Sequence, residues 1–290
     1  MTPAQQMIPA AIAHVRSLAT AAAGIASIML LPTMALAQLP EWAPKPPPRV
    51  AEERFRAEVL VLGAGFDTTL RVDESLTEEG TRIDVEEDLG LEESQILAQG
   101  ELTLLPGDHH LVRLSGMTTR RSAQKTLELE IEFDDETYFV GERVDSELNL
   151  TMVGLTYGYR FLVADRGELA GTFGIQIAEV EANAVVRSRV IRDAESGVAP
   201  LPLAGLEGRF DFSSRWSAEA RVQYLTADIE EVDGSILDAR FALTWRKNPH
   251  FLFGVGYRSF TIEVDSRNED TPGFVDMRID GPMLFMRASL

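Results

Sequence analysis

The sequence predicts an all-β fold, a closed antiparallel transmembrane β-barrel of about ten strands (8–12) that follows an N-terminal signal peptide and a Pro-rich linker. Three observations support this fold class. Several segments alternate apolar and polar residues with period two, a strand pattern that a helix cannot imitate. Tight and long connections alternate along the chain. The first 55 residues have the composition of an export signal and a tether.

Residues 1–37 form the expected signal peptide. They contain no acidic residue and a single arginine, and an apolar stretch from Leu18 to Leu31 ends at Pro32. Ala35-Leu36-Ala37 then places small residues at the cleavage positions, a layout typical of secretory signal peptides. An uncleaved membrane helix is the alternative, which Pro32 and the Ala-x-Ala ending disfavour. We therefore expect an exported chain that is cut after Ala37.

Residues 38–55 are expected to form a periplasmic linker. This segment holds five prolines, which favour an extended tether. A Pro-rich partner motif is the alternative, and composition alone favours the plain linker.

The alternating pattern begins at residue 56, so we expect residues 56–290 to form the barrel domain. In Trp216–Tyr224, for example, Trp, Ala, Ala, Val and Tyr share one face, while Ser, Glu, Arg and Gln share the other. No stretch after residue 37 reaches the ~18 consecutive apolar residues of a spanning helix. The expected strands are 56–72, 94–105, 109–120, 146–162, 168–189, 200–212, 215–230, 235–246, 250–265 and 275–290.

Two segments break the simple pattern. In the fourth expected strand, Leu148, Leu150 and Met152 lie on one parity, whereas Val153–Tyr159 carries apolar residues on the other. Either a bulge or an extension beyond the membrane would reconcile them. Residues 127–133 also alternate but fall in an expected outer loop, which indicates a hairpin above the membrane surface.

The connections between these strands fall into two classes. Four are tight, at 106–108, 164–167, 213–214 and 247–249. Four are longer and mostly charged, at 73–93, 121–145, 190–199 and 266–274, and the connection around 232–234 is a short exception. Barrels with an even number of strands in the outer membrane have short periplasmic turns and longer outside loops. A soluble sandwich has no reason to sort its loops in this way.

The two faces of the expected strands have different chemistry. One face carries a lipid-facing aromatic girdle next to the tight turns, formed by Tyr157, Tyr159, Phe161, Phe212, Trp216, Trp245 and Phe251. The other face is expected to form a charge network inside the barrel, from Glu101, Glu207, Arg209, Glu219, Arg221, Asp238, Arg240, Arg246 and Arg258. In a soluble sandwich the apolar face would instead be the core, and the charged face would meet water.

The end of the chain carries a family resemblance. Leu284, Met286, Ala288 and Leu290 alternate up to the last residue. This ending resembles the closing strand of Gram-negative outer-membrane β-barrel proteins, and Gly80–Leu91 resembles a loop of uncharacterised small barrels of this kind. The resemblance covers most of residues 56–290 and is architectural. It implies a cell outer-membrane location and recognition of the C-terminal strand by the barrel assembly machinery.

Composition excludes several function classes. The formal charge of −19 argues against nucleic acid as a partner, because phosphate binding needs concentrated Lys and Arg. The chain has no cysteine, which excludes disulfides and thiolate metal sites. We expect no cofactor and no resident metal.

Catalysis is not expected. Omptin-like proteases resemble this chain in having ten strands and use Asp and His at the outer rim, and lipid A deacylases use a Ser and His pair facing the outer leaflet. The histidines that remain after the signal peptide, His109, His110 and His250, all lie beside expected periplasmic turns. They are therefore at the wrong end for either enzyme type.

Two charged segments are candidate binding surfaces. The 73–93 loop contains ten acidic residues, which we interpret as a solvated surface rather than a divalent-cation site, because it lacks the spacing of an EF-hand. Arg120, Arg121 and Lys125 form a basic cluster at the expected outer rim. These residues either contact lipopolysaccharide phosphates or offset the neighbouring glutamates, and both readings stay open.

The sequence therefore predicts a non-enzymatic outer-membrane β-barrel that has a structural role or passes or binds a small solute. Its expected partners are outer-membrane lipid and lipopolysaccharide. A soluble periplasmic β-barrel or sandwich binding an apolar ligand is the alternative, and an outer-membrane hydrolase is the third hypothesis.

Overall fold

The structure, a computed structural model, describes residues 53–72, 82–126, 131–133, 136–138, 140–186, 191–229, 232–266 and 273–290. The expected signal peptide and residues 38–52 of the expected linker lie outside the described residues. None of the described segments contains a helix long and apolar enough to cross a membrane.

Thirteen strands make up the described part of the chain. They are β1 (Phe55–Val72), β2 (Arg82–Asp84), β3 (Ser94–Leu104), β4 (His110–Thr126), β5 (Ile131–Phe133), β6 (Glu136–Tyr138), β7 (Arg143–Ala164), β8 (Gly167–Val186), β9 (Ile191–Asp211), β10 (Trp216–Ile229), β11 (Val232–Arg246), β12 (Phe251–Ser266) and β13 (Gly273–Ser289). Ten of them coincide with the ten expected strands, with boundaries that differ mainly at the ends away from the tight turns.

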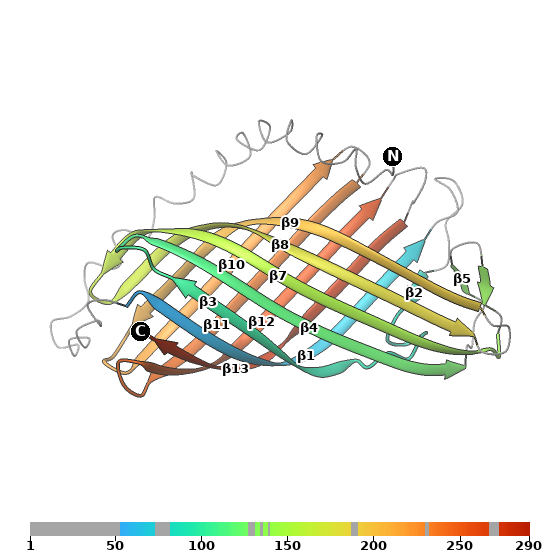
Figure 1. The fold of residues 1–290 in the computed structure, drawn as a ribbon, viewed down its shortest axis with the longest axis horizontal. Coiled ribbons are helices and arrows are strands. Elements are labelled where there is room, and N and C mark those ends of the chain that lie inside the picture. The colour runs from blue at the N-terminus through green and yellow to red at the C-terminus, as the bar shows by residue number, and fades with distance from the viewer. Residues whose placement is uncertain are drawn as a thin grey trace. The chain divides into compact units, whose positions relative to one another are not determined.

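These ten strands form a closed antiparallel barrel (Figure 1). The neighbours run β13-β12-β11-β10-β9-β8-β7-β4-β3-β1, and β1 pairs with β13 from Arg56↔Ser289 to Val72↔Gly273 to complete the ring. Every strand of the ring therefore has a hydrogen-bonded neighbour on each side over part of its length. The expected fold class, a closed ten-stranded antiparallel barrel, is confirmed.

The tight turns all lie at one end of the barrel. Leu290 N–H donates to the carbonyl of Phe55 at 2.9 Å at this same end. Short side chains complete two of the turns. The Ser213 hydroxyl accepts from Trp216 N–H at 2.9 Å, and Asn248 Oδ1 accepts from Phe251 N–H at 2.8 Å. The longer connections lie at the opposite end, which we call the outer end.

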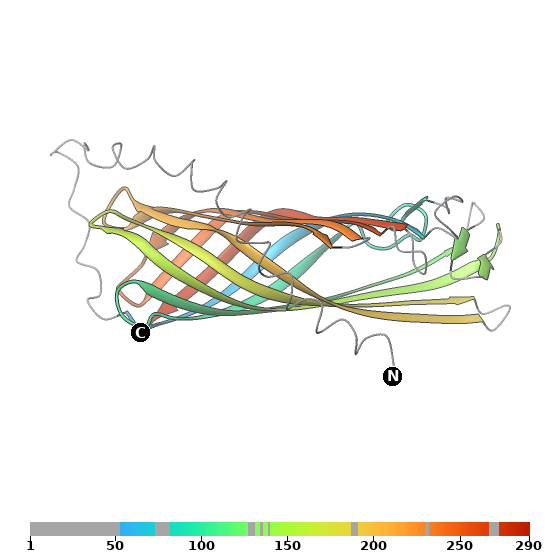
Figure 2. The same cartoon turned by 90° about the horizontal axis from the view of Figure 1, so that it is seen from above.

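Four neighbouring strands reach farther than the others at the outer end: β4, which pairs with β7 as far as Thr126↔Arg143, and β7, β8 and β9. β7, β8 and β9 have 22, 20 and 21 residues, against 14 to 16 in β10, β11 and β12. Figures 1 and 2 show them passing the ends of the orange and red strands. The short β5 and β6 pair with each other, near where a hairpin was expected, and residues 127–130 lie outside the described part.

Side chains alternate strictly between the two faces of the barrel. Outward residues are large and apolar over a broad band on all ten strands, as in Leu155 and Phe241, which are more than half exposed. In β7 the inward residues Leu150 and Met152 are also buried and apolar, which explains the two parities in the sequence. The register of β7 with β8 shifts only between Arg160 and Leu162. A bulge, one of the two explanations given for residues 148–159, is therefore wrong. The inner face of β7 is apolar at these positions because Leu150 and Met152 belong to an apolar core inside the barrel.

We predict that Gly281→Ala destabilises the closing seam of the barrel. A Cβ at Gly281 would overlap the backbone carbonyl of Gly63 on β1, and backbone cannot move aside as a side-chain tip can. We expect a loss of about 1–3 kcal/mol, the usual cost of overpacking. The measurement is a urea titration of the folded protein in lipid vesicles. Gly100→Ala on β3 is the matched control, because nothing lies within 4 Å of its added Cβ. Equal stability of the two variants would contradict the prediction.

Candidate functional site

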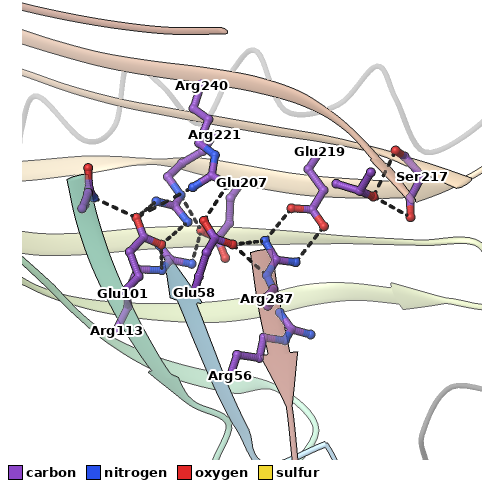
Figure 3. Close-up of polar contacts among 12 residues, drawn as sticks. Arg56, Glu58, Glu101, Arg113, Glu207, Ser217, Glu219, Arg221, Arg240 and Arg287 are labelled. Atoms are coloured by element: carbon purple, nitrogen blue, oxygen red, sulfur yellow. Dashed lines mark hydrogen bonds and ion pairs between the residues drawn. The ribbon is translucent and has the colours of Figure 1, made fainter. Parts of the chain in front are cut away.

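Charged side chains gather inside the barrel near the tight-turn end. They come from seven strands of the ring and belong to residues far apart in the sequence (Figure 3). We call the ion-paired members of this set the lumen network: Glu58, Glu101, Arg113, Glu207, Glu219, Arg221, Arg240 and Arg287. Strand alternation turns each of them inward, so the barrel wall encloses them all.

Glu101 is a centre of the lumen network. Its carboxylate accepts two hydrogen bonds from Arg221, at 2.9 and 3.1 Å, in a bidentate arrangement. Arg113 Nε lies 3.6 Å from Oε2 of Glu101, and Gln99 Nε2 donates a hydrogen bond to Oε1 of Glu101 at 3.1 Å. Glu101 is buried, and a buried carboxylate is tolerated only when it is paired and hydrogen-bonded.

Glu58 is a second centre. Its two oxygens lie 2.6 Å from Arg240 Nη2 and 2.7 Å from Arg287 Nη2. Arg287 also donates two hydrogen bonds to Glu219, at 2.8 and 2.7 Å. Figure 3 shows the Arg287 guanidinium lying between the two carboxylates.

Glu207 and Arg240 join further members of the network. Glu207 lies 2.7 Å from Arg113 and 3.4 Å from Arg221. Arg240 Nη1 is 3.9 Å from Glu101, which links the two centres electrostatically. The result is a continuous series of opposite charges that connects β1, β3, β4, β9, β10, β11 and β13 across the lumen.

The nine interior residues expected from the sequence all lie on inward-facing positions, and the structure brings five of them together. Glu101, Glu207, Glu219, Arg221 and Arg240 belong to the lumen network. The other four do not join it by a direct ion pair. Arg258 binds Asp238 through two hydrogen bonds of 3.0 and 2.9 Å, Arg209 binds Asp211 through two of 2.9 Å, and Arg246 lies closer to the turns.

Sequence analysis missed three members of the lumen network: Glu58, Arg113 and Arg287. The signal was present, because Glu58 alternates with outward Val59 and Arg287 with outward Met286. Extending the alternation to the ends of β1 and β13 would have identified both.

An apolar core fills the lumen on the outer side of the lumen network. It includes Leu60, Leu62 and Phe66 from β1, Leu150 and Met152 from β7, Leu203 from β9, Phe260 and Ile262 from β12, and Ile279, Met283 and Phe285 from β13. β1 and β9 lie on opposite sides of the ring, so these side chains pack across the lumen. Phe285 joins the two layers, because the Arg240 guanidinium lies 4.3 Å from the centre of its ring.

The seven residues of the expected aromatic girdle lie on the outer surface near the tight turns. Tyr157, Tyr159, Phe161, Phe212, Trp216 and Phe251 are exposed, and Trp245 is half-buried beside Phe253 with ring centres 6.2 Å apart. His110 Nδ1 lies 2.7 Å from the Tyr157 hydroxyl, and the His109 ring stacks on Tyr159. His250 Nδ1 lies 3.0 Å from the carbonyl of Ser289. The three histidines therefore lie at the tight-turn end and contact the girdle or the chain end.

The expected outer-rim cluster of Arg120, Arg121 and Lys125 does not form. Arg121 is buried inside the barrel in an ion pair with Glu86, and Lys125 donates to the carbonyl of Glu87. Arg120 is exposed on the outside and pairs with Glu147 at 2.7 Å. The expectation is wrong because neighbouring residues of a strand point to opposite faces.

The acidic loop is also not wholly a solvated surface. Residues 73–81 lie outside the described part of the chain, but residues 82–93 fold against the barrel. β2 pairs with β1, and Ile83, Val85 and Leu91 are buried. Glu86 is buried too. It accepts from the Thr68 N–H at 2.8 Å and pairs with Arg121, whose guanidinium lies over Phe66. This segment fills the wall between the outer parts of β1 and β4, which β3 is too short to reach.

Within the described residues no group of His, Asp and Glu side chains is arranged to hold a metal ion.

Of the comparisons with known proteins, the one with solved structures gives matches. No family model matches the chain, and no curated protein matches its sequence. Among solved structures, the outer membrane protease OmpT from Escherichia coli is similar, with a TM-score of 0.51 and 10% identity, over 82% of this chain and 97% of that one. The translocator domain of autotransporter NalP from Neisseria meningitidis gives a TM-score of 0.42 at 10% identity over 82% and 89%. Ail of Yersinia pestis gives 0.32 at 11% identity over 79% and 99%. The likeness to OmpT shows that the chain has the fold of an outer-membrane β-barrel.

We predict that Glu58→Leu strongly destabilises the barrel. The substitution leaves Arg240 buried without its carboxylate and takes one of two acceptors from Arg287, and breaking a buried pair costs about 3–5 kcal/mol. Urea unfolding in lipid vesicles measures the loss. Glu147→Leu is the matched control, because its partner Arg120 is exposed and ion pairs between exposed groups contribute little to stability. A similar small loss in both variants would show that the lumen network does not hold the barrel together.

We predict that Glu86→Ala releases the 82–93 segment. Arg121 would remain buried without its ion-pair partner, so the segment should open. The side chain of Arg82 is already exposed, but its backbone would leave the pairing with β1 and become accessible to trypsin. The measurement is the rate of cleavage after Arg82, followed by mass spectrometry, and we expect an increase of roughly tenfold or more. Glu87→Ala is the control, since the neighbouring Glu87 side chain is exposed and only its carbonyl is used by Lys125. Equal cleavage rates would refute a locking role for Glu86.

Proposed function

We propose that this chain is exported to the cell outer membrane and forms a closed barrel with a structural or adhesive role, rather than a route for solutes. The observation that supports this most directly is the filled lumen. The lumen network crosses the barrel near the tight-turn end, and the apolar core packs beyond it. A solute would have to break buried ion pairs and then part a packed core.

The outer surface supports the membrane location. Soluble proteins rarely expose large contiguous apolar patches, yet the outward apolar residues here continue around the ring. A periplasmic soluble protein would have to cover this surface. The aromatic girdle beside the short turns has the position that such residues take at a membrane interface. Lipid is therefore the proposed partner of this surface.

The outer parts of β4, β7, β8 and β9 are the proposed site of function. A 22-residue strand spans roughly 70 Å, and with a tilt near 40° it rises roughly 50 Å, while the apolar band of such barrels is about 25 Å tall. The outward face becomes polar from Thr118 and Thr151 onward, with the Arg120–Glu147 pair and a 3.3 Å contact from Asn149 to Glu181. We infer that this sheet stands above the membrane. Arg120 is its candidate contact with lipopolysaccharide phosphates.

An unpaired strand edge favours an adhesive role for this sheet. β9 pairs with β8 as far as Ile191, but its pairing with β10 stops at Ala204. Among the described strands, nothing pairs with residues 191–203 on that side. Pro200 and Pro202 have no N–H to offer there, which protects the part of the edge nearest the membrane. The remaining backbone can add a strand from a partner.

Two further proposals concern one partner and one enzymatic activity. The C-terminal strand β13 closes the ring, so it is the proposed contact of the barrel assembly machinery. A hydrolase remains the alternative of a different class. Nothing in the lumen network favours it, because its carboxylates are all held by arginines.

We predict that the purified, refolded protein gives no steady conductance in a planar lipid bilayer. Because the lumen network and the apolar core occupy the lumen in two layers, we expect no continuous water path through the described part of the barrel. Folding is verified separately by the shift in gel mobility on heating, which only an intact barrel shows. A steady, ion-selective conductance from protein that passes this control would overturn the structural role and favour solute passage.

A further inference from the structure

A small polar cavity lies beside the lumen network at its tight-turn side. Its volume is about 60 Å³, and seven arginine but only three glutamate side chains line it. This lining is unusual because the lumen network as a whole pairs nearly every arginine with a carboxylate. The cavity is therefore lined by more hydrogen-bond donors than acceptors among its charged side chains.

Three of these guanidinium groups have an N–H group without an acceptor. Arg113 uses Nη2 for Glu207 at 2.7 Å, and its Nη1 is buried without a hydrogen bond. Arg160 donates Nη1 to Glu168 at 3.4 Å and Nη2 to the Gly107 carbonyl at 3.1 Å, which leaves Nε buried without a hydrogen bond. Arg240 Nη1 lies 3.9 Å from Glu101, beyond hydrogen-bonding distance.

Two of these three arginines are deeply buried, and Arg160 is partly buried. Arg113 and Arg240 are 6% and 7% exposed, so bulk water does not satisfy their donors. The buried side-chain atoms around the cavity that lack a hydrogen bond are almost all donors. The one carboxylate oxygen nearby without a hydrogen bond, Oε1 of Glu58, already lies 2.6 Å from Arg240. A buried donor without an acceptor costs about 1–3 kcal/mol, more when it is charged.

We propose that this cavity binds a small tetrahedral oxyanion such as phosphate or sulfate. Such an ion offers acceptors on every side and needs few or no donors, and the planar guanidinium fork matches its oxygens. Water brings two donors with each molecule, so it would satisfy the arginines less well. The volume has room for roughly four to six waters or one ion of this size, and none for a nucleotide or a sugar.

The bound ion would complete the lumen network. It would accept from the neighbouring strands β4 and β7 and from β11, which lies elsewhere in the ring, and so tie β11 to the other two. This inference does not depend on the proposed function, because a conducting barrel could hold the ion equally well.

The experiment uses the folded full barrel in detergent and inorganic phosphate and sulfate as probes. We expect either ion to raise the unfolding temperature at constant ionic strength, whereas chloride should not, and calorimetric titration should give one site per chain. Arg160→Gln should weaken binding roughly tenfold or more, because it removes a donor at the edge of the cavity. Arg278→Gln is the control, since the side chain of this arginine is exposed and does not line the cavity, so the substitution should leave binding unchanged.

A second measurement does not depend on any variant. Crystals grown with selenate should show the anomalous signal of selenium in the cavity. The selenate oxygens around it should lie within hydrogen-bonding distance of Arg113 and Arg160. The proposal is overturned if the cavity shows only water in those crystals, or if Arg160→Gln binds phosphate as tightly as the unchanged chain.

Discussion

Inside a membrane each backbone N–H and C=O must find its partner within the protein, and the rest of this structure depends on that constraint. Pairing of β13 with β1 meets it by closing the sheet into a ring. Closure then forces the side chains into two sets, one that faces the surroundings and one that faces the lumen. The first set is apolar, and the second is free to differ in chemistry along the barrel axis.

The lumen uses that freedom in two layers. Near the tight turns the enclosed residues are charged, and because buried charges are costly unless paired, nearly all of them are matched by arginine and carboxylate partners on other strands. Beyond them the enclosed residues are apolar and pack across the ring. The charged layer specifies which strands face each other, since a register slip of one residue would turn its members into lipid. The apolar layer contributes burial that does not depend on exact geometry.

Sequence reasoning identified the ten strands because period-two alternation is a local signal, visible in Trp216–Tyr224 without knowledge of the partner strand. It also identified which face was charged. It could not show that Glu101 pairs with Arg221, 120 residues away, because pairing across a lumen depends on the closure of the ring. Nor could it separate Arg121 from Arg120, since the expected strand ended at Arg120 and Arg121 was assigned to the following loop, so their opposite faces were not recognised. The burial of Glu86 depends on an irregular segment without any periodic pattern.

Closure by the last strand has a consequence for how the chain folds. Arg287 and Glu58 are 229 residues apart, and the contact that completes the ring joins the first strand to the last. Bringing such distant segments together has a high loop-closure entropy, so folding is expected to be slow and to finish only when the whole chain is present. Until then both terminal strands expose unpaired backbone and apolar faces to any other chain in the same state. A nascent chain of this protein thus needs shielding from aggregation for the entire interval before its two ends meet.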